Sequence, residues 1–136
     1  MILQEERTKQ ILEELVQNII QLENNQQLKW NRISSIQIRT TTDQGQITFY
    51  AHQKFSLKGW EISPAFFELH TKNLKLNLYL NEYPKLSDLG KTLIDRYLSD
   101  LTGNNEEATQ ELLAFSKSLS KEVFRDLRIK DILENK

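Results

Sequence analysis

Few residues in this chain are of types that could perform chemistry. His52 and His70 are the only imidazoles, and Glu68 would share a strand face with His70, because side chains alternate along a strand. Two histidines and a carboxylate can hold a transition metal, so a metal site would form if folding brought His52 onto a neighbouring strand. Histidines on a water-facing strand surface are the simpler interpretation. We therefore expect no metal and no cofactor.

Other catalytic patterns are absent from the sequence. The chain contains no cysteine, which excludes a disulfide framework, a thiol nucleophile and a zinc–thiolate site. Its four glycines are too scattered along the chain to form a phosphate-binding loop. Acidic pairs such as Asp88 and Asp95 fall on polar helix faces, where solvation and helix capping account for them. We expect a protein that is not an enzyme.

Positive charge gathers in the middle of the chain. Residues 27–86 contain eight Lys or Arg and four Asp or Glu, whereas both flanking segments are acidic. Arg39, Lys54 and Lys75 fall on the same polar strand faces as Tyr50 and Tyr79. Cations suit phosphates and flat rings suit bases, so single-stranded nucleic acid is one predicted partner. The sequence pI of about 6.1 argues against it, which makes this the alternative function.

A second group of aromatic residues could form a protein-binding surface. Trp60, Phe66 and Phe67 lie close together in the sequence, either as core residues or as anchors for a partner, since Trp is a favoured residue at interfaces. With a well-patterned fold and no assembled chemistry, the leading prediction is a small protein-interaction module that is adaptor-like, chaperone-like or inhibitor-like. The partner would be another protein, and the sequence leaves a homodimer open.

The elements that would position these residues begin with a helix over residues 4–22. Its apolar side chains form two adjacent rows with a step of four, and the polar run 23–27 ends it. Alternation then predicts strands over residues 30–40, 46–55 and 73–81, with a hairpin turn at 42–45. Residues 63–72 fit either a short helix after Pro64 or an extra strand, and we favour the strand.

The helical period returns after Pro84. Ser87 could cap a helix with apolar positions four apart from Leu89 to Leu101, and Gly103 would end it. Asn104 or Asn105 could cap another helix, with residues 125–136 as its continuation or as a separate short helix.

These elements predict an α+β protein in a single domain over residues 1–136. We expect an N-terminal amphipathic helix, a three- to four-stranded antiparallel sheet, and two to three C-terminal helices packed on one sheet face. No apolar run is long enough to span a membrane, and the first residues do not have the pattern of a secretion signal. We therefore expect a cytoplasmic location and no membrane partner.

Overall fold

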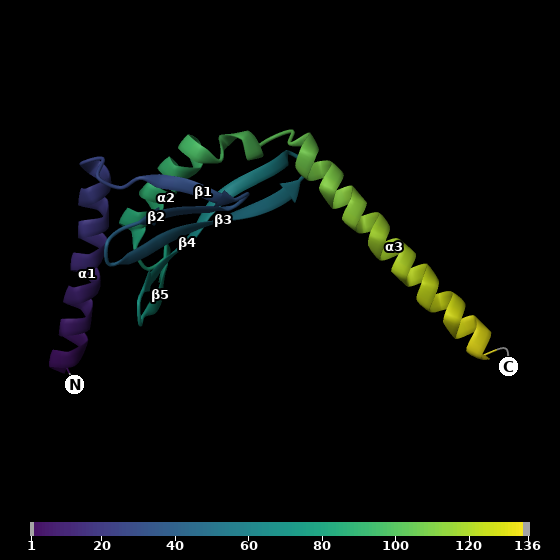
Figure 1. Ribbon diagram of the computed structural model, residues 1–136, viewed down its shortest axis with the longest axis horizontal. Coiled ribbons are helices and arrows are strands. Elements are labelled where there is room, and N and C mark those ends of the chain that lie inside the picture. Colours follow the sequence, from purple (N-terminus) through teal and green to yellow (C-terminus); the bar gives the residue numbers. More distant parts are fainter. Residues whose placement is uncertain (1, 135–136) are drawn as a thin grey trace. The chain divides into compact units, whose positions relative to one another are not determined.

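The computed structural model describes the backbone of residues 2–134 and the side chains of residues 3–128. The chain divides into two compact units, residues 1–103 and 104–136, and each is described by itself. The second unit contains helix α3 (Glu106–Glu134). The elements of the first unit, labelled in Figure 1, are α1 (Ile2–Asn24), β1 (Trp30–Ser34), β2 (Gln37–Thr41), β3 (Gly45–Ser56), β4 (Gly59–Thr71), β5 (Lys75–Tyr79), α2 (Pro84–Tyr97) and the short 3₁₀ helix η1 (Ser99–Leu101).

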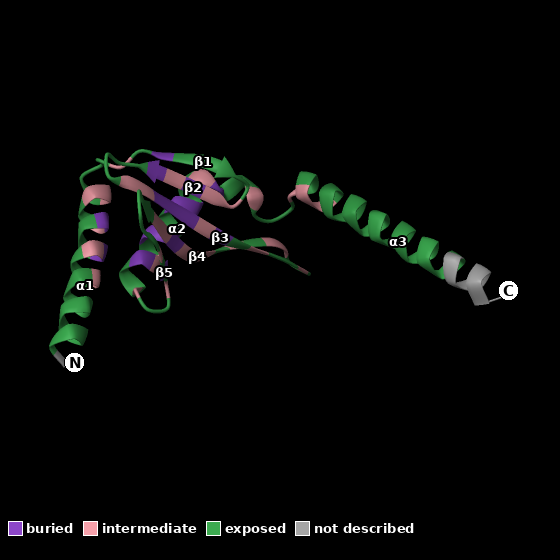
Figure 2. Ribbon diagram, turned by 60° about the horizontal axis from the view of Figure 1, so that its bottom comes forward, coloured by how far each residue is buried: buried purple, intermediate pink, exposed green. Residues whose placement is uncertain are grey.

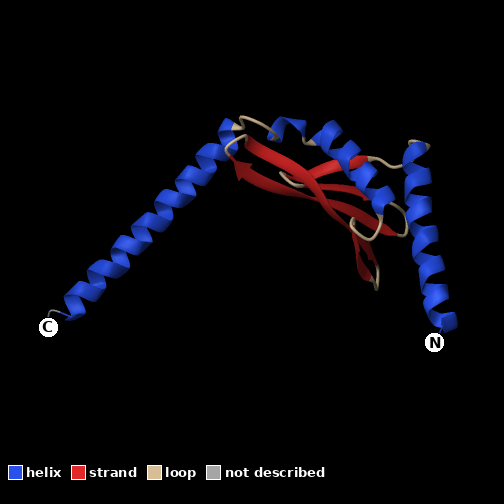
Figure 3. Ribbon diagram, turned by 180° about the vertical axis from the view of Figure 1, so that it is seen from behind, coloured by secondary structure: helices blue, strands red, loops and turns tan. Residues whose placement is uncertain are grey.

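The strands form one antiparallel sheet in which each strand pairs with the next along the chain (Figure 3). This confirms the α+β class and the antiparallel sheet. Within residues 2–134 the sheet has five strands, more than the three to four predicted. The additional strand arises because a turn at residues 35–36 divides the expected strand 30–40 into β1 and β2.

Residues 63–72 belong to a strand, as we favoured, in spite of Pro64. Tyr50 of β3 lies opposite Phe66, and Ala51 lies opposite Pro64, so Ala65 is the extra residue of a β-bulge in β4. A bulge interrupts the ladder of backbone hydrogen bonds, and proline is tolerated there because it has no N–H to donate. The short-helix alternative is therefore wrong.

One face of the sheet forms the protein core. Residues directly opposite each other on paired strands share a face, and the row Ile38, Phe49, Phe67 and Leu78 crosses β2 to β5 with every member fully buried. The rings of Phe49 and Phe67 lie 4.9 Å apart between centroids. Trp30 of β1 packs edge-on against Phe67 at 6.4 Å.

Helix α2 covers this core face, and α1 packs beside α2 (Figure 2). Helix α2 begins at Pro84, earlier than the Ser87 cap that the sequence suggested, because proline suits the first turn of a helix. Its buried face includes Leu86, Leu89 and Leu93, so packing of a C-terminal helix on one sheet face is confirmed for α2. Among the described residues, no helix combines the length and hydropathy needed to cross a membrane.

Helix α2 approaches the sheet closely at Gly90. A Cβ atom at this position would lie 2.9 Å from Pro64 Cβ and 3.0 Å from Phe49 Cε1, which is shorter than normal carbon–carbon contacts. Phe49 is fully buried and Pro64 is rigid, so neither can move away easily. Glycine therefore sets the distance between the helix and the sheet.

We expect Gly90→Ala to lower the free energy of unfolding by about 1 kcal/mol, measured by urea denaturation. In an exposed helix, alanine is more stabilising than glycine by about 1 kcal/mol. Adding a methyl group to a packed core costs about 1–3 kcal/mol, and this cost should exceed the gain in helix stability. Lys91→Ala, on the exposed side of α2, is the control and should change stability by less than about 0.5 kcal/mol. A more stable Gly90→Ala protein would show that the helix and sheet are not in close contact.

Candidate functional site

The sheet face opposite α2 is polar, and we call it the open face. Neither α1 nor α2 covers it. It is defined by three rows of residues paired across β2 to β5: Gln37–Tyr50–Phe66–Tyr79, Arg39–Thr48–Glu68–Asn77 and Thr41–Gln46–His70–Lys75. Lys54 continues the same side of β3, since residues 50, 52 and 54 alternate with the core-facing residues. All five residues predicted for nucleic-acid binding therefore lie on one face.

An aromatic row crosses the open face from β3 to β5. The rings of Tyr50 and Phe66 are stacked, with centroids 4.6 Å apart and an angle of 11° between their planes. The rings of Phe66 and Tyr79 lie 5.8 Å apart at 45°. Phe66 therefore has an aromatic neighbour on each side, and Tyr79 on the edge strand is the most exposed ring of the row, at 47%. A base could stack only at the ends of this row.

The cations of the open face lie beside acceptors. The Arg39 guanidinium donates from Nε to Thr48 Oγ1 at 3.0 Å. Lys75 Nζ lies 3.8 Å from a carboxylate oxygen of Glu68, and Lys54 is opposite Glu61. Because two carboxylates balance part of the positive charge, this surface attracts phosphate less than three free cations would.

Phe66 and Phe67 lie on opposite faces of β4, as alternation along a strand requires. Phe66 is half-buried on the open face. Phe67 is fully buried between Phe49 and Trp30 in the core, so its predicted role as a partner-binding residue has to be corrected. Sequence alternation contained this information, because only one of two adjacent strand residues can face outward.

Trp60 lies at the far end of the β3–β4 hairpin. Its ring contacts Phe55 edge-on at 4.7 Å, and its backbone N–H and C=O each make a 2.8 Å hydrogen bond with Gly103. Phe55 is 48% exposed, and Leu57 at the turn is completely exposed. Phe55, Leu57 and Trp60 form a small apolar patch, which we call the hairpin end.

The structure does not bring the two histidines together. His70 lies opposite Gln46, whereas His52 lies opposite Ser63, and positions 46 and 52 are six residues apart on β3. At about 3.3 Å per residue, the two imidazoles are separated by about 20 Å along the sheet. Among the described residues, no three His, Cys, Asp or Glu side chains could share a metal ion. His52, Glu68 and His70 therefore do not form the metal site that the sequence allowed.

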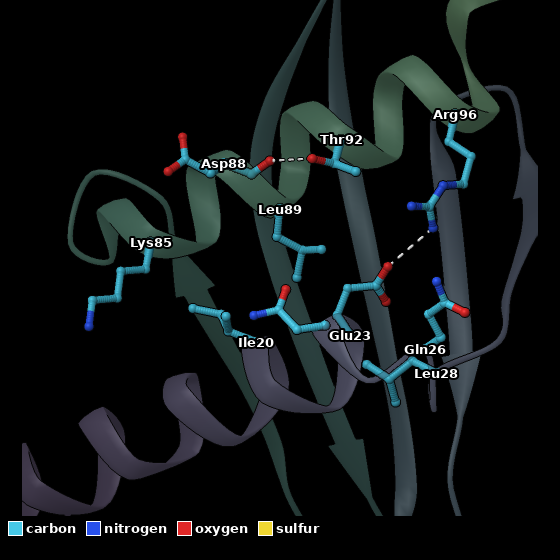
Figure 4. A pocket seen from close by; sticks show the side chains of 10 residues that line it. Ile20, Glu23, Gln26, Leu28, Lys85, Asp88, Leu89, Thr92 and Arg96 are labelled. Atoms are coloured by element: carbon cyan, nitrogen blue, oxygen red, sulfur yellow. Dashed lines mark hydrogen bonds and ion pairs between the residues drawn. The ribbon is translucent and has the colours of Figure 1, made fainter.

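A groove of about 680 Å³ lies between α1 and α2 (Figure 4). Ile20, Leu28 and Leu89 contribute apolar side chains to this groove. Glu23 and Arg96 also line it, and they form an ion pair at 3.1 Å. Hydrogen bonds with Tyr97 and with Glu23 raise the pKa of the Arg96 guanidinium above its ordinary value, so this arginine stays charged. The ion pair neutralises this part of the groove.

Glu23 also connects the helices to the sheet. Its second carboxylate oxygen accepts a hydrogen bond of 2.6 Å from the indole Nε1 of Trp30, and the Glu23 side chain is only 12% exposed. One carboxylate thus joins the end of α1 to β1 and to α2. Sequence reasoning missed this role, because Glu23 stands in a polar run that looked like an ordinary loop.

Asn105 precedes helix α3, and its side-chain Oδ1 accepts a 3.1 Å hydrogen bond from the backbone N–H of Ala108. This is an N-cap, as the sequence suggested, and the helix continues without a break to Glu134. Its large apolar side chains are between 45% and 72% exposed. Five of them recur on one side of the helix and two border that side; we call the seven the α3 stripe: Leu112, Phe115, Leu119, Val123 and Leu127, with Leu113 and Phe124.

Comparisons with known proteins add no further information on the site. No family model, no curated protein and no solved structure matches this chain. The fold and the exposed surfaces define a small antiparallel α+β protein followed by a long amphipathic helix. Its three candidate surfaces are the open face, the hairpin end and the α3 stripe.

We expect Glu23→Ala to lower the free energy of unfolding by about 1–3 kcal/mol, because the buried indole N–H of Trp30 would lose its acceptor. Loss of the ion pair with Arg96 should lower the free energy of unfolding only slightly further, because Arg96 is half-exposed and solvent screens the pair. Glu13→Ala is the matched control on the same helix, and its exposed carboxylate should contribute less than about 0.5 kcal/mol. Equal effects of the two substitutions in urea denaturation would contradict the proposed role of Glu23.

Proposed function

We propose that this protein is a non-enzymatic protein-binding module, located in the cytoplasm as the sequence suggested, which binds its partner through the α3 stripe. One observation carries the proposal. Seven large apolar side chains of α3 are exposed, whereas the apolar side chains that α2 turns toward the sheet are buried. A helix acquires most of its stability by burying its apolar side, so an exposed side of this length is suited to a partner.

The composition of α3 supports the same proposal. Among residues 106–128, the positions outside the stripe carry charged, polar or alanine side chains, so the large apolar side chains of this part are concentrated on one half of the helix. Amphipathic helices of this kind bind proteins by inserting side chains spaced three and four apart into an apolar groove. Phe115 and Leu119 lie near the middle of the stripe, where such anchors contribute most to binding.

The proposal predicts that Leu119→Asp abolishes partner capture. Tagged wild-type and variant proteins would be used to isolate partners from native lysate treated with nuclease, followed by quantitative mass spectrometry. Placing a carboxylate at the centre of an apolar contact should cost about 2 kcal/mol or more, which reduces the captured partner by about thirtyfold.

Ala114→Asp is the matched control, because it adds the same carboxylate on the opposite side of α3. It should leave capture unchanged. Trp60→Ala tests the hairpin end, where the sequence placed its leading anchor. If capture survives Leu119→Asp but is lost with Trp60→Ala, the partner binds at the hairpin end and the role of the α3 stripe is contradicted.

The open face supports a second candidate, which is binding of single-stranded nucleic acid. The observation in its favour is that Arg39, Lys54 and Lys75 share the open face with the aromatic row that ends at Tyr79. Against it stand the partial balancing of these cations by carboxylates and the stacking of Tyr50 on Phe66. We therefore rank it second.

This candidate predicts that changing Arg39, Lys54 and Lys75 together to Glu abolishes binding of a fluorescent single-stranded oligonucleotide. Binding by the wild-type protein should also weaken as salt is raised, because phosphate contacts release counterions. Reversal of Lys58, Lys85 and Lys91, which are exposed elsewhere in the first unit, makes the same change in net charge and is the control. Equal loss of binding in both triple variants would show a general charge effect and remove the open face as a site.

A further inference from the structure

The charges of α3 are distributed unevenly along its length. The first part, residues 104–116, contains Glu106, Glu107 and Glu111 and no Lys or Arg. The following part, residues 117–128, is basic, with Lys117, Lys121, Arg125 and Arg128 against two acidic residues. The acidic part, residues 104–116, is therefore complementary in charge to the basic part, residues 117–128.

This distribution selects one orientation for two copies of α3 that pair side by side. A parallel pair would place the acidic parts together and the basic parts together, which is unfavourable. An antiparallel pair places each acidic part beside the basic part of the other helix. In an isologous dimer every such contact occurs twice, so the preference is doubled.

The spacing of the apolar side chains fits the same arrangement. Leu112 and Val123 are equally distant from the midpoint between residues 117 and 118, and because they are eleven residues apart they lie on nearly the same line along the helix. In an antiparallel pair centred there, Leu112 contacts Val123 of the second copy. Phe115 and Leu119 lie on either side of the centre. The α3 stripe is thus self-complementary.

Three charged residues, Glu111, Glu122 and Arg125, border this contact on one side, and the pair of Glu111 and Arg125 favours the antiparallel orientation. Glu111 and Arg125 are fourteen residues apart, which is close to four helical turns, so both lie along the same side of the stripe. In the antiparallel pair, Glu111 of one copy lies beside Arg125 of the other, and both side chains are exposed and can reach each other. No residue of the first unit is needed for this contact.

From these observations we propose that the partner bound by the α3 stripe is a second copy of this chain, paired antiparallel about the midpoint of residues 117 and 118. The inference rests on the proposed function, since it assumes that the stripe is a protein-binding surface. It adds the identity of the partner and the orientation of the two helices.

Sedimentation velocity of the full-length chain over a hundredfold range of concentration tests the proposal. The wild-type protein should dimerise reversibly. Glu111→Arg and Arg125→Glu should each raise the dimer Kd by about tenfold, since each places like charges together at two symmetric contacts. The double variant, which exchanges the two charges, should return the Kd to within about threefold of the wild-type value.

Lys121→Glu is the charge-reversal control, because Lys121 lies on the side of α3 opposite Leu112 and Leu119. It should leave the Kd unchanged, and circular dichroism should show the same helix content in all variants. A double variant as weak as the single variants would overturn the antiparallel arrangement. A dimer that is unaffected by Leu119→Asp would overturn the role of the stripe.

Cross-linking gives a separate test of orientation, because the natural chain has no cysteine. In the antiparallel pair, Glu111 lies about 20 Å from its own counterpart but beside Arg125 of the second copy. Glu111→Cys and Arg125→Cys proteins should therefore form a disulfide when mixed and none when oxidised alone. A disulfide in the Glu111→Cys protein alone would indicate parallel helices.

The dimer test and the capture experiment can fail separately. A chain that remains monomeric at every concentration overturns the pairing of two copies. If that monomer still captures a different protein in a manner that depends on Leu119, the proposed function holds and only the identity of the partner is wrong. If capture is also independent of Leu119, both proposals fail.

Discussion

The close contact between helix α2 and the sheet at Gly90 is the constraint on which the rest of the first unit depends. A helix that lies within normal contact distance of Phe49 and Pro64 leaves no room for a side chain at the contact point, so glycine fixes the layer spacing. Once α2 occupies this face, the row from Ile38 to Leu78 becomes the core. The opposite row, with Tyr50, Phe66 and Tyr79, must then face away from the helices, so the placement of a single helix decides which aromatic residues a partner can reach.

The class of fold could be predicted from the sequence because it depends on local periodicity. Apolar residues that recur every four positions predicted α1 and the helical region after Pro84. Alternating apolar and polar residues predicted the strands from Trp30 to Tyr79. The number of strands could not be predicted as well, because the short turn between Ser34 and Gln37 resembles a continuous strand in the sequence. The β-bulge at Ala65 is a second limit: Pro64 is compatible with a bulge, but the position of the bulge depends on the pairing with β3, which the sequence of β4 does not give.

The candidate surfaces could be predicted only where they depend on strand alternation. Alternation placed Arg39, Tyr50 and Lys54 on polar faces, and pairing of the strands then brought them together. The separation of His52 from His70 depends on the pairing register, which a sequence pattern does not give. Helix α3 shows a different limit, since periodicity identifies an apolar side but not whether that side is covered. Within the second unit the apolar side chains of α3 are exposed, and this makes the α3 stripe a candidate binding surface.

The division of the chain into two units has a consequence for how binding and folding are related. Every buried apolar side chain in the described part of the protein lies between Val16 and Leu98, so the core of the first unit is complete without the large apolar residues of α3. Residues under selection for packing usually cannot change without loss of stability, because a core tolerates few changes of shape. The large apolar residues of the α3 stripe belong to the second unit and are exposed. This exposure is the observation behind the proposal that the α3 stripe binds another chain.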